Sequence, residues 1–140
     1  MLTFSRQYSF SAAHRLWQSQ WPDEKNSQIF SDCSRVHGHN YTLTVTLSGS
    51  LNTEIGGIYD LEKLDALVQD VILDRVSHYR LDTDVDFLLG QVITVEALAQ
   101  AFYTRLAPKV NDPNYPDTKL YALKVAESSD LWAEVVVERN

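Results

Sequence analysis

The stretch His-Gly-His-Asn-Tyr-Thr-Leu-Thr-Val-Thr-Leu-Ser-Gly, residues 37–49, carries the clearest structural signal in the chain. From Tyr41 onward, apolar side chains alternate with threonine and serine until the turn-forming Gly49. Because successive side chains of a β-strand point to opposite faces, this alternation predicts a strand with one buried face. His37 and His39 share the parity of Tyr41, so we expect both imidazoles on the buried side.

A second alternation lies at the N-terminus. Between Leu2 and His14 the even positions are largely apolar and the odd positions polar, with Arg6 as the exception. This pattern predicts a half-buried strand in which His14 also faces inward. Three inward histidines on two strands can supply three nitrogens to one ion, which leaves a fourth tetrahedral position for water or substrate, as catalytic zinc requires. The alternative is that each is an ordinary hydrogen-bonded core histidine.

The rest of the sequence predicts two helices and two more strands. A helix capped by Asp60 and a second helix over about 94–106 have apolar residues at three- and four-residue spacing. Two final strands, 119–127 and 131–138, are joined by a turn. The order ββααββ predicts a single α+β domain, 1–140, with a four-stranded antiparallel sheet and two helices on one face. The polar, aperiodic stretch 17–32 is expected to be a long functional excursion.

Composition limits the function. The 140 residues include 12 Lys and Arg against 19 Asp and Glu, a net charge of −7, which argues against nucleic acid or an anionic membrane as partner. No apolar run is long enough to span a bilayer and no signal peptide is visible, so we expect a cytoplasmic protein. The only cysteine, Cys33, cannot form an intramolecular disulfide, which leaves a buried filler, a metal ligand or a reactive thiol.

Several motifs resemble the 6-pyruvoyl-tetrahydropterin synthase family: Phe10-Ser-Ala-Ala-His14, Cys33-Ser-Arg-Val-His37-Gly-His39-Asn-Tyr41, and matching blocks at 57–60, 77–81, 94–96 and 127. The three residues between Cys33 and His37 look like the bacterial branch, the 6-carboxytetrahydropterin synthases that make a queuosine precursor. The resemblance implies the tunnelling fold and assembly as a closed homo-oligomer, typically a hexamer built as a dimer of trimers.

The resemblance also implies catalytic roles. His14, His37 and His39 would bind Zn²⁺, Cys33 would transfer a proton at the substrate side chain, and His78 would be the partner acid or base. A thiol near a metal can have its pKa lowered enough to act as a base. A buried small hydrophobe for Cys33 and a helix-end cap for His78 are the structural alternatives.

Substrate contacts follow from the same resemblance. Glu127 continues the inward positions of the strand before it, and an inward carboxylate needs a partner. In the family the matching glutamate binds the guanidine-like edge of the pterin ring, and Thr94 and Glu96 match further pterin-contacting positions. A structural salt bridge for Glu127 and a helix N-cap for Thr94 are the alternatives.

Three positions depart from the family pattern. Ser77 stands where an Asp that orients the histidine is usual, and Asp82 and Ala97 each stand where an Asn is usual. Ser77 can replace the orienting carboxylate only in part. A nearby acid such as Asp74 or Asp82 is a possible substitute.

The expected function is a zinc-dependent lyase that converts 7,8-dihydroneopterin triphosphate to 6-carboxy-5,6,7,8-tetrahydropterin. The alternatives are a 6-pyruvoyl-tetrahydropterin synthase, a sepiapterin-cleaving lyase, and a zinc- and pterin-binding paralogue that Ser77 has impaired. A triphosphate needs a local basic patch, for which Arg15, Lys25 and Arg35 are candidates, with solvated surface charge as the alternative. A zinc hydrolase is disfavoured because no Glu stands beside the histidines as a base.

Overall fold

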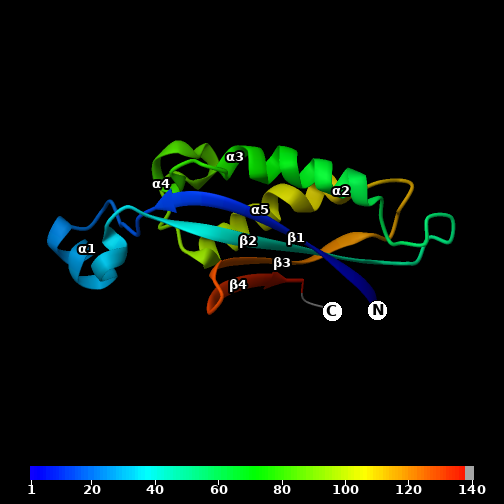
Figure 1. Ribbon diagram of the computed structural model, residues 1–140, viewed down its shortest axis with the longest axis horizontal. Helices are drawn as coiled ribbons and strands as arrows, with labels where there is room; N and C mark the ends of the chain where they lie inside the picture. The colour runs from blue at the N-terminus through cyan, green and yellow to red at the C-terminus, as the bar shows by residue number, and fades with distance from the viewer. Residues whose placement is uncertain (138–140) are drawn as a thin grey trace.

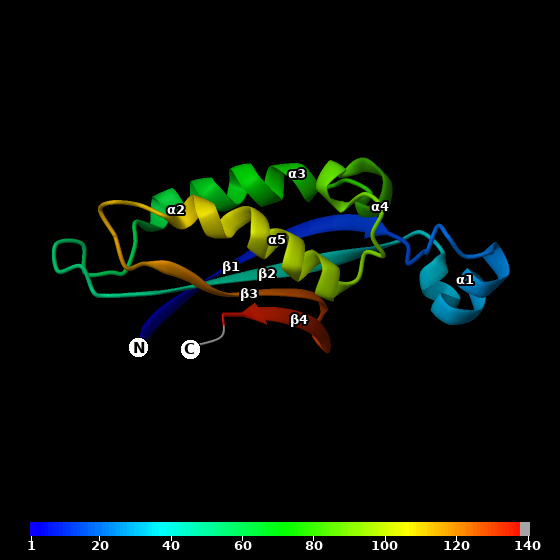
Figure 2. The same ribbon diagram turned by 180° about the vertical axis from the view of Figure 1, so that it is seen from behind.

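The computed structural model describes residues 1–137 and has a four-stranded antiparallel sheet with helices on one face (Figures 1 and 2). The sheet order follows the sequence order, β1-β2-β3-β4. The strands are β1 (Leu2–His14), β2 (His37–Gly49), β3 (Lys119–Ser128) and β4 (Leu131–Val136). The predicted α+β class and antiparallel sheet are confirmed.

The covering layer consists of α5 and a second, interrupted helix. The helix α5 spans Val95–Val110. The interrupted helix consists of α2 (Leu61–Val68), the π-helix η2 (Gln69–Leu73) and α3 (Asp74–Val76). Two short elements, α4 (Leu81–Asp84) and η3 (Asp86–Leu88), join them. The predicted start after Asp60 is confirmed, because its carboxylate accepts a hydrogen bond from the Lys63 amide. Among residues 1–137, no helix has both the length and the apolar character needed to cross a bilayer.

The π-helical interruption between α2 and α3 was not predicted. A π-helix widens the hydrogen-bonding turn by one residue and leaves backbone groups to be satisfied from elsewhere. Here Arg105 of α5 donates its Nε–H to the Val71 carbonyl at 2.9 Å. Since the donor comes from a neighbouring helix, the pattern of apolar residues along 61–76 gives no sign of the irregular turn.

The core lies between the helices and the inward face of β1, β2 and β3. Its largest fully buried side chains include Tyr41, Leu43, Leu47 and Leu123 from the sheet and Leu64, Ile72, Leu98, Phe102 and Leu106 from the helical layer. Burying each such side chain contributes roughly 1.5–3 kcal/mol. This buried face fixes the register of β2, because a slip of one residue would turn every threonine inward.

The excursion between β1 and β2 projects beyond the end of the sheet and holds a helix (Figure 1). It comprises α1 (Asp23–Phe30) and the 3₁₀ turn η1 (Ser31–Ser34). Asn26 is completely buried; its side chain accepts from the Gln18 amide and donates to the Gln18 and Pro22 carbonyls. A buried polar side chain therefore organises the segment, which explains why apolar periodicity failed to predict α1.

The C-terminal hairpin agrees with the prediction as far as the described residues extend. β3 ends at Ser128 and β4 begins at Leu131, so the turn lies where the sequence indicated. The predicted end of the last strand, Glu138, lies outside the described residues.

Candidate functional site

Three histidines converge at the junction of β1 and β2. The register pairs His14 with His37 and Ala12 with His39, so the three side chains lie on the same face of the sheet at its end. The ring centroids are 4.6 Å apart for His14 and His37, and 4.9 Å apart for His37 and His39. One nitrogen from each ring lies within 4.8 Å of the others. The convergence that a three-histidine metal site requires is present.

Backbone carbonyls orient two of these rings. His14 donates its Nδ1–H to the Ile93 carbonyl at 2.8 Å, and His37 donates its Nδ1–H to the Arg35 carbonyl at 2.7 Å. A neutral imidazole that is protonated on Nδ1 keeps a lone pair on Nε2. Metal-ligating histidines are commonly fixed in this way by their second nitrogen.

The buried Nε2 atoms of His14 and His39 have no hydrogen-bond partner among the residues that the structure describes. Burial, together with the neighbouring His37, lowers the pKa of His14 to about 4. Burial also lowers the pKa of His39, although Glu127 opposes the change. Two neutral imidazoles with buried, unpaired nitrogens are costly unless a cation fills the space between them, so these residues fit a zinc ion.

Glu127, at the end of β3, faces the histidines. Its Oε2 lies 3.3 Å from His39 Nε2 and 3.9 Å from His14 Nε2, and its side chain is 17% exposed. The sequence predicted an inward carboxylate, and the structure places it beside two imidazoles whose Nε2 atoms make no hydrogen bond to it.

Sequence reasoning missed the hydroxyl of Tyr41. The ring is 1% exposed and stacks on Phe10 with centroids 4.8 Å apart. Its hydroxyl has no hydrogen-bond partner within residues 1–137, and burial raises its pKa with a contribution from Glu127. The signal was available, since a tyrosine two positions after His39 must face the same side of the strand.

Cys33 lies apart from the histidine group in the described structure. It is exposed on η1, so the buried-filler alternative is wrong. Its carbonyl accepts a hydrogen bond from the Leu16 amide at 2.8 Å, which ties η1 to the residues just after His14. Among the described residues, the cluster of metal-ligating atoms comprises His14, His37 and His39 without the thiol.

His78 lies on a different surface. Its amide donates to the Ser11 carbonyl at 2.6 Å, and it borders a cavity of about 610 Å³ with Ser11, Gly38 and Asn40. Those three positions alternate with His14, His37 and His39 along β1 and β2, so they belong to the opposite face of the sheet. His39 also lines this cavity, while the described cluster of metal-ligating nitrogens comprises His14, His37 and His39 without His78.

Ser77 contacts the ring that the missing Asp would orient. Ser77 Oγ lies 2.9 Å from His78 Nδ1, and His78 adopts a left-handed backbone conformation with φ of 67°. Neither candidate acid takes the place of the missing carboxylate, because Asp82 accepts both hydrogen bonds from Arg80 and Asp74 accepts one from Gln69. The orientation of His78 thus depends on a hydroxyl.

Thr94 and Glu96 lie at the start of α5, directly after the Ile93 carbonyl that holds His14. Thr94 Oγ1 accepts a hydrogen bond from the Ala97 amide, so the N-cap alternative is observed. Glu96 is exposed in the first turn. The structure brings both residues to the metal end of the molecule without giving either a ligand contact.

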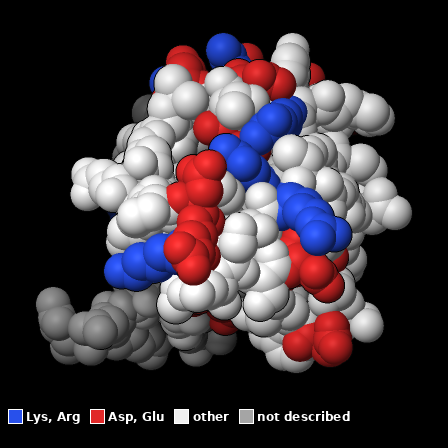
Figure 3. All heavy atoms as spheres, turned by 90° about the vertical axis from the view of Figure 1, so that its left-hand side faces the viewer, with Lys and Arg blue, Asp and Glu red and all other residues white. Residues whose placement is uncertain are grey.

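Two of the three candidate phosphate-binding residues pack on aromatic rings in the excursion. Arg15 lies over the Trp17 ring at 3.9 Å and Lys25 over the Trp21 ring at 4.1 Å. The end of the molecule that carries α1 presents several Lys and Arg side chains between acidic groups (Figure 3).

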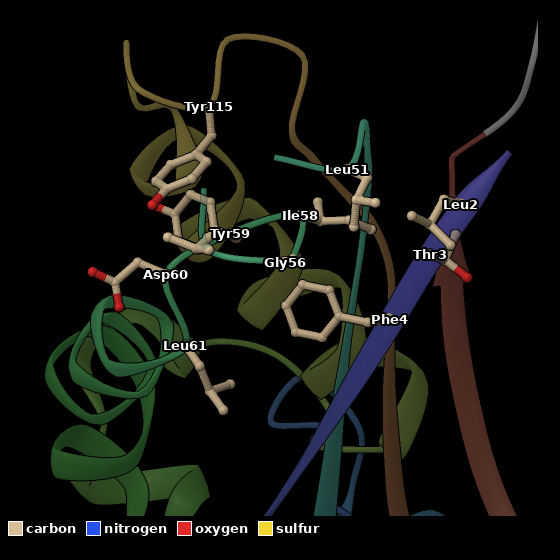
Figure 4. A pocket seen from close by; sticks show the side chains of 12 residues that line it. Leu2, Thr3, Phe4, Leu51, Gly56, Ile58, Tyr59, Asp60, Leu61 and Tyr115 are labelled. Atoms are coloured by element: carbon tan, nitrogen blue, oxygen red, sulfur yellow. The ribbon is translucent and has the colours of Figure 1, made fainter. Parts of the chain in front are cut away.

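A cavity of about 670 Å³ lies at the other end of the sheet, beside the first residues of β1 (Figure 4). Phe4, Leu61 and the facing rings of Tyr59 and Tyr115 form its largely apolar walls. The Tyr59 hydroxyl donates to the Val110 carbonyl at 2.9 Å and is already satisfied. This cavity lacks the converging polar groups found at the histidines.

A family model described as 6-pyruvoyl tetrahydropterin synthase matches residues 3–138. The protein belongs to this family. The human 6-pyruvoyl tetrahydrobiopterin synthase is 33% identical over 128 residues, which cover 90% of this protein and 85% of the relative. A Haemophilus influenzae 6-carboxy-5,6,7,8-tetrahydropterin synthase is 32% identical over 81 residues, 56% of this protein and 50% of the relative.

The fold of the family is also shared. The solved structure of Caenorhabditis elegans 6-pyruvoyl tetrahydropterin synthase superposes with a TM-score of 0.87 at 34% identity, over 98% of this protein and 96% of that one. The resemblance that the sequence motifs indicated is therefore confirmed at the level of the family and its architecture.

Proposed function

We propose that this protein is a zinc-dependent lyase that acts on a pterin and converts 7,8-dihydroneopterin triphosphate to 6-carboxy-5,6,7,8-tetrahydropterin. The observation that carries the proposal is the pair of buried, unpaired Nε2 atoms on His14 and His39, with His37 beside them. These three residues would hold the Zn²⁺ ion. When bound, that ion supplies Lewis-acid polarisation of an oxygen on the substrate side chain, which acidifies the neighbouring C–H bond.

The protein groups would divide the remaining work. Glu127 would accept two hydrogen bonds from adjacent N–H donors on the pterin ring, a bidentate match that fixes the ring. Thr94 and Glu96 are proposed as further ring contacts. Cys33 would take or return a proton on the substituent of the ring, with His78 as the partner acid or base.

A homohexamer, arranged as a dimer of trimers, is part of the proposal. His78 lies outside the described three-histidine cluster and borders a cavity that His39 also lines, so contacts between copies are one way to complete the surroundings of the metal. A cytoplasmic location is likewise proposed from the sequence.

A second candidate for the product is the 6-pyruvoyl compound. The three-residue spacing between Cys33 and His37 favours the 6-carboxy product, whereas the human and nematode relatives carry the 6-pyruvoyl name at 33% and 36% identity. Elimination of triphosphate, with tautomerisation that moves side-chain hydrogens to the ring, gives the 6-pyruvoyl compound. Addition of water and cleavage of the carbon–carbon bond between the two side-chain carbonyls, with release of a two-carbon aldehyde, gives the 6-carboxy compound. Sepiapterin cleavage and a catalytically impaired pterin-binding role are the remaining alternatives, the last motivated by Ser77.

Incubation of zinc-loaded protein with 7,8-dihydroneopterin triphosphate, followed by mass spectrometry, tests the proposal. We expect zinc-dependent triphosphate release and the 6-carboxy product, and a 6-pyruvoyl product would assign the second candidate. Bound pterin without turnover would assign the impaired role. A protein that neither binds a pterin nor releases triphosphate would overturn the assignment.

A further inference from the structure

Glu127 reaches the histidines from an irregular point in β3. The β3–β4 register pairs Ala126 with Trp132 and then Ser128 with Leu131, which leaves Glu127 without a partner in β4. Such a β-bulge redirects a side chain and is found next to active sites. Strand alternation places Glu127 on the face of the buried Leu123 and Val125, and the irregularity frees it from a β4 partner at the point where it meets the imidazoles.

The contact between Glu127 and the histidines is not a hydrogen bond. Glu127 Oε2 lies 3.3 Å from His39 Nε2 and 3.9 Å from His14 Nε2, yet neither nitrogen has a hydrogen-bond partner among residues 1–137. In His14 the ring proton is on Nδ1, where it is donated to Ile93, so the Nε2 lone pair faces a carboxylate oxygen. Two electron-rich atoms repel each other at this distance unless a cation lies between them.

The spacing suits a shared metal ion. Zinc bonds to nitrogen and carboxylate oxygen are about 2.0–2.1 Å long, so two donors of a tetrahedral site lie about 3.3 Å apart. The observed 3.3 Å between Glu127 Oε2 and His39 Nε2 matches that edge. The three histidine nitrogens, within 4.8 Å of one another, would draw closer on binding.

We propose that Glu127 is the fourth protein ligand of the ion held by His14, His37 and His39 when no substrate is bound, and that a pterin releases it by pairing with the same carboxylate. The release step rests on the proposed function, whereas the resting coordination does not. Ring recognition and exposure of the metal position would then be one event, since the carboxylate cannot serve both partners at once.

Cobalt substitution tests the resting coordination without turnover. Chelator-stripped protein is loaded with Co²⁺, and azide is added while the visible spectrum is recorded. With four protein ligands, azide should leave the wild-type spectrum unchanged. In Glu127→Gln, where a solvent-accessible position opens, azide should change the spectrum, and metal affinity should fall by about tenfold or more. Glu134→Gln, an exposed carboxylate on β4, is the matched control and should behave as wild type.

The outcomes separate the two proposals. A wild-type spectrum that responds to azide as strongly as the Glu127→Gln spectrum would overturn the fourth-ligand proposal while leaving the three-histidine site in place. Weaker metal binding in Glu127→Gln without a change in azide response would mean that the carboxylate acts only through its charge, which also overturns it. Failure of the wild type to bind metal would remove the proposed function itself. Adding neopterin should make the wild-type spectrum responsive to azide, and no response would refute the release step.

Discussion

The Nδ1–H of His14 donates to the Ile93 carbonyl at 2.8 Å, across the gap between the end of β1 and the start of α5. The bond fixes the ring tautomer and links the metal end of the sheet to the residues before Thr94. It follows that His14→Ala should lose more than the roughly 10- to 100-fold in zinc affinity that removal of a ligand's partner costs.

Metal analysis of chelator-washed protein checks this prediction. The wild type should retain about one zinc ion per protomer and His14→Ala almost none. His78→Asn is the matched control, because Asn tolerates the left-handed backbone of this residue. Equal zinc content in wild type and His14→Ala would contradict the assignment.

The Ser77–His78 contact should control turnover more than binding. Ser77→Ala removes the group that lies 2.9 Å from Nδ1, and we expect kcat to fall about tenfold with little change in KM. Ser77→Asp supplies a carboxylate that stabilises the protonated ring and should raise kcat. Ser9→Ala, an exposed serine on β1, serves as the control. Unchanged kinetics in Ser77→Asp would make the missing Asp irrelevant.

Asp82→Asn should destabilise the fold even though it introduces the residue that the family usually has. Asp82 accepts two hydrogen bonds from Arg80, at 3.0 and 2.8 Å, and losing the charge should cost about 1 kcal/mol. Burial opposes ionisation, but the Arg80 hydrogen bonds prevail and lower the pKa of Asp82 from 3.8.

The stability difference between wild type and Asp82→Asn should decrease as the pH falls. Because the folded-state pKa of Asp82 is lowered, its contribution is fully present above the unfolded value of 3.8 and is lost as the pH falls through the folded pKa. Urea denaturation of wild type and Asp82→Asn at pH 7 and at successively lower pH should show the two stabilities converging. A constant difference across that range would disprove the linkage.

Asn26→Asp should loosen the excursion without melting the sheet. The substitution places a carboxylate oxygen against the carbonyls of Gln18 and Pro22, where Asn26 donates, and an unsatisfied buried group costs about 1–3 kcal/mol. Hydrogen exchange should accelerate over residues 16–34 and stay slow in β2. Asn114→Asp, at an exposed position, should leave both unchanged.

Strand alternation predicted the sheet well because β1 and β2 each have one buried face. The same parity placed His14, His37 and His39 on that face and Glu127 beside them. Parity assigns a side chain to a face but does not determine which strands are neighbours, so the convergence of the three nitrogens to within 4.8 Å could not be predicted from it. Cys33 and His78 were predicted as catalytic residues from the family motifs and not from periodicity.

The features that the sequence analysis missed are polar groups on residues that do not disturb the apolar pattern. Asn26 organises α1 from a completely buried position, and Arg105 completes the irregular turn at Val71. The Tyr41 hydroxyl was counted with the apolar face because its ring packs there. None of these residues interrupts the apolar pattern, so hydrophobic periodicity passes over them.

The π-helix η2 has a further consequence for the direction in which the backbone leaves α3. One extra residue in a helical turn rotates everything after it by about 100°. Since α3 is three residues long and ends just before Ser77, that azimuthal offset decides where His78 meets the Ser11 carbonyl. Deleting one residue from 69–73 would restore a regular helix and point His78 elsewhere, so the length of this segment is as constrained as the identity of the histidine.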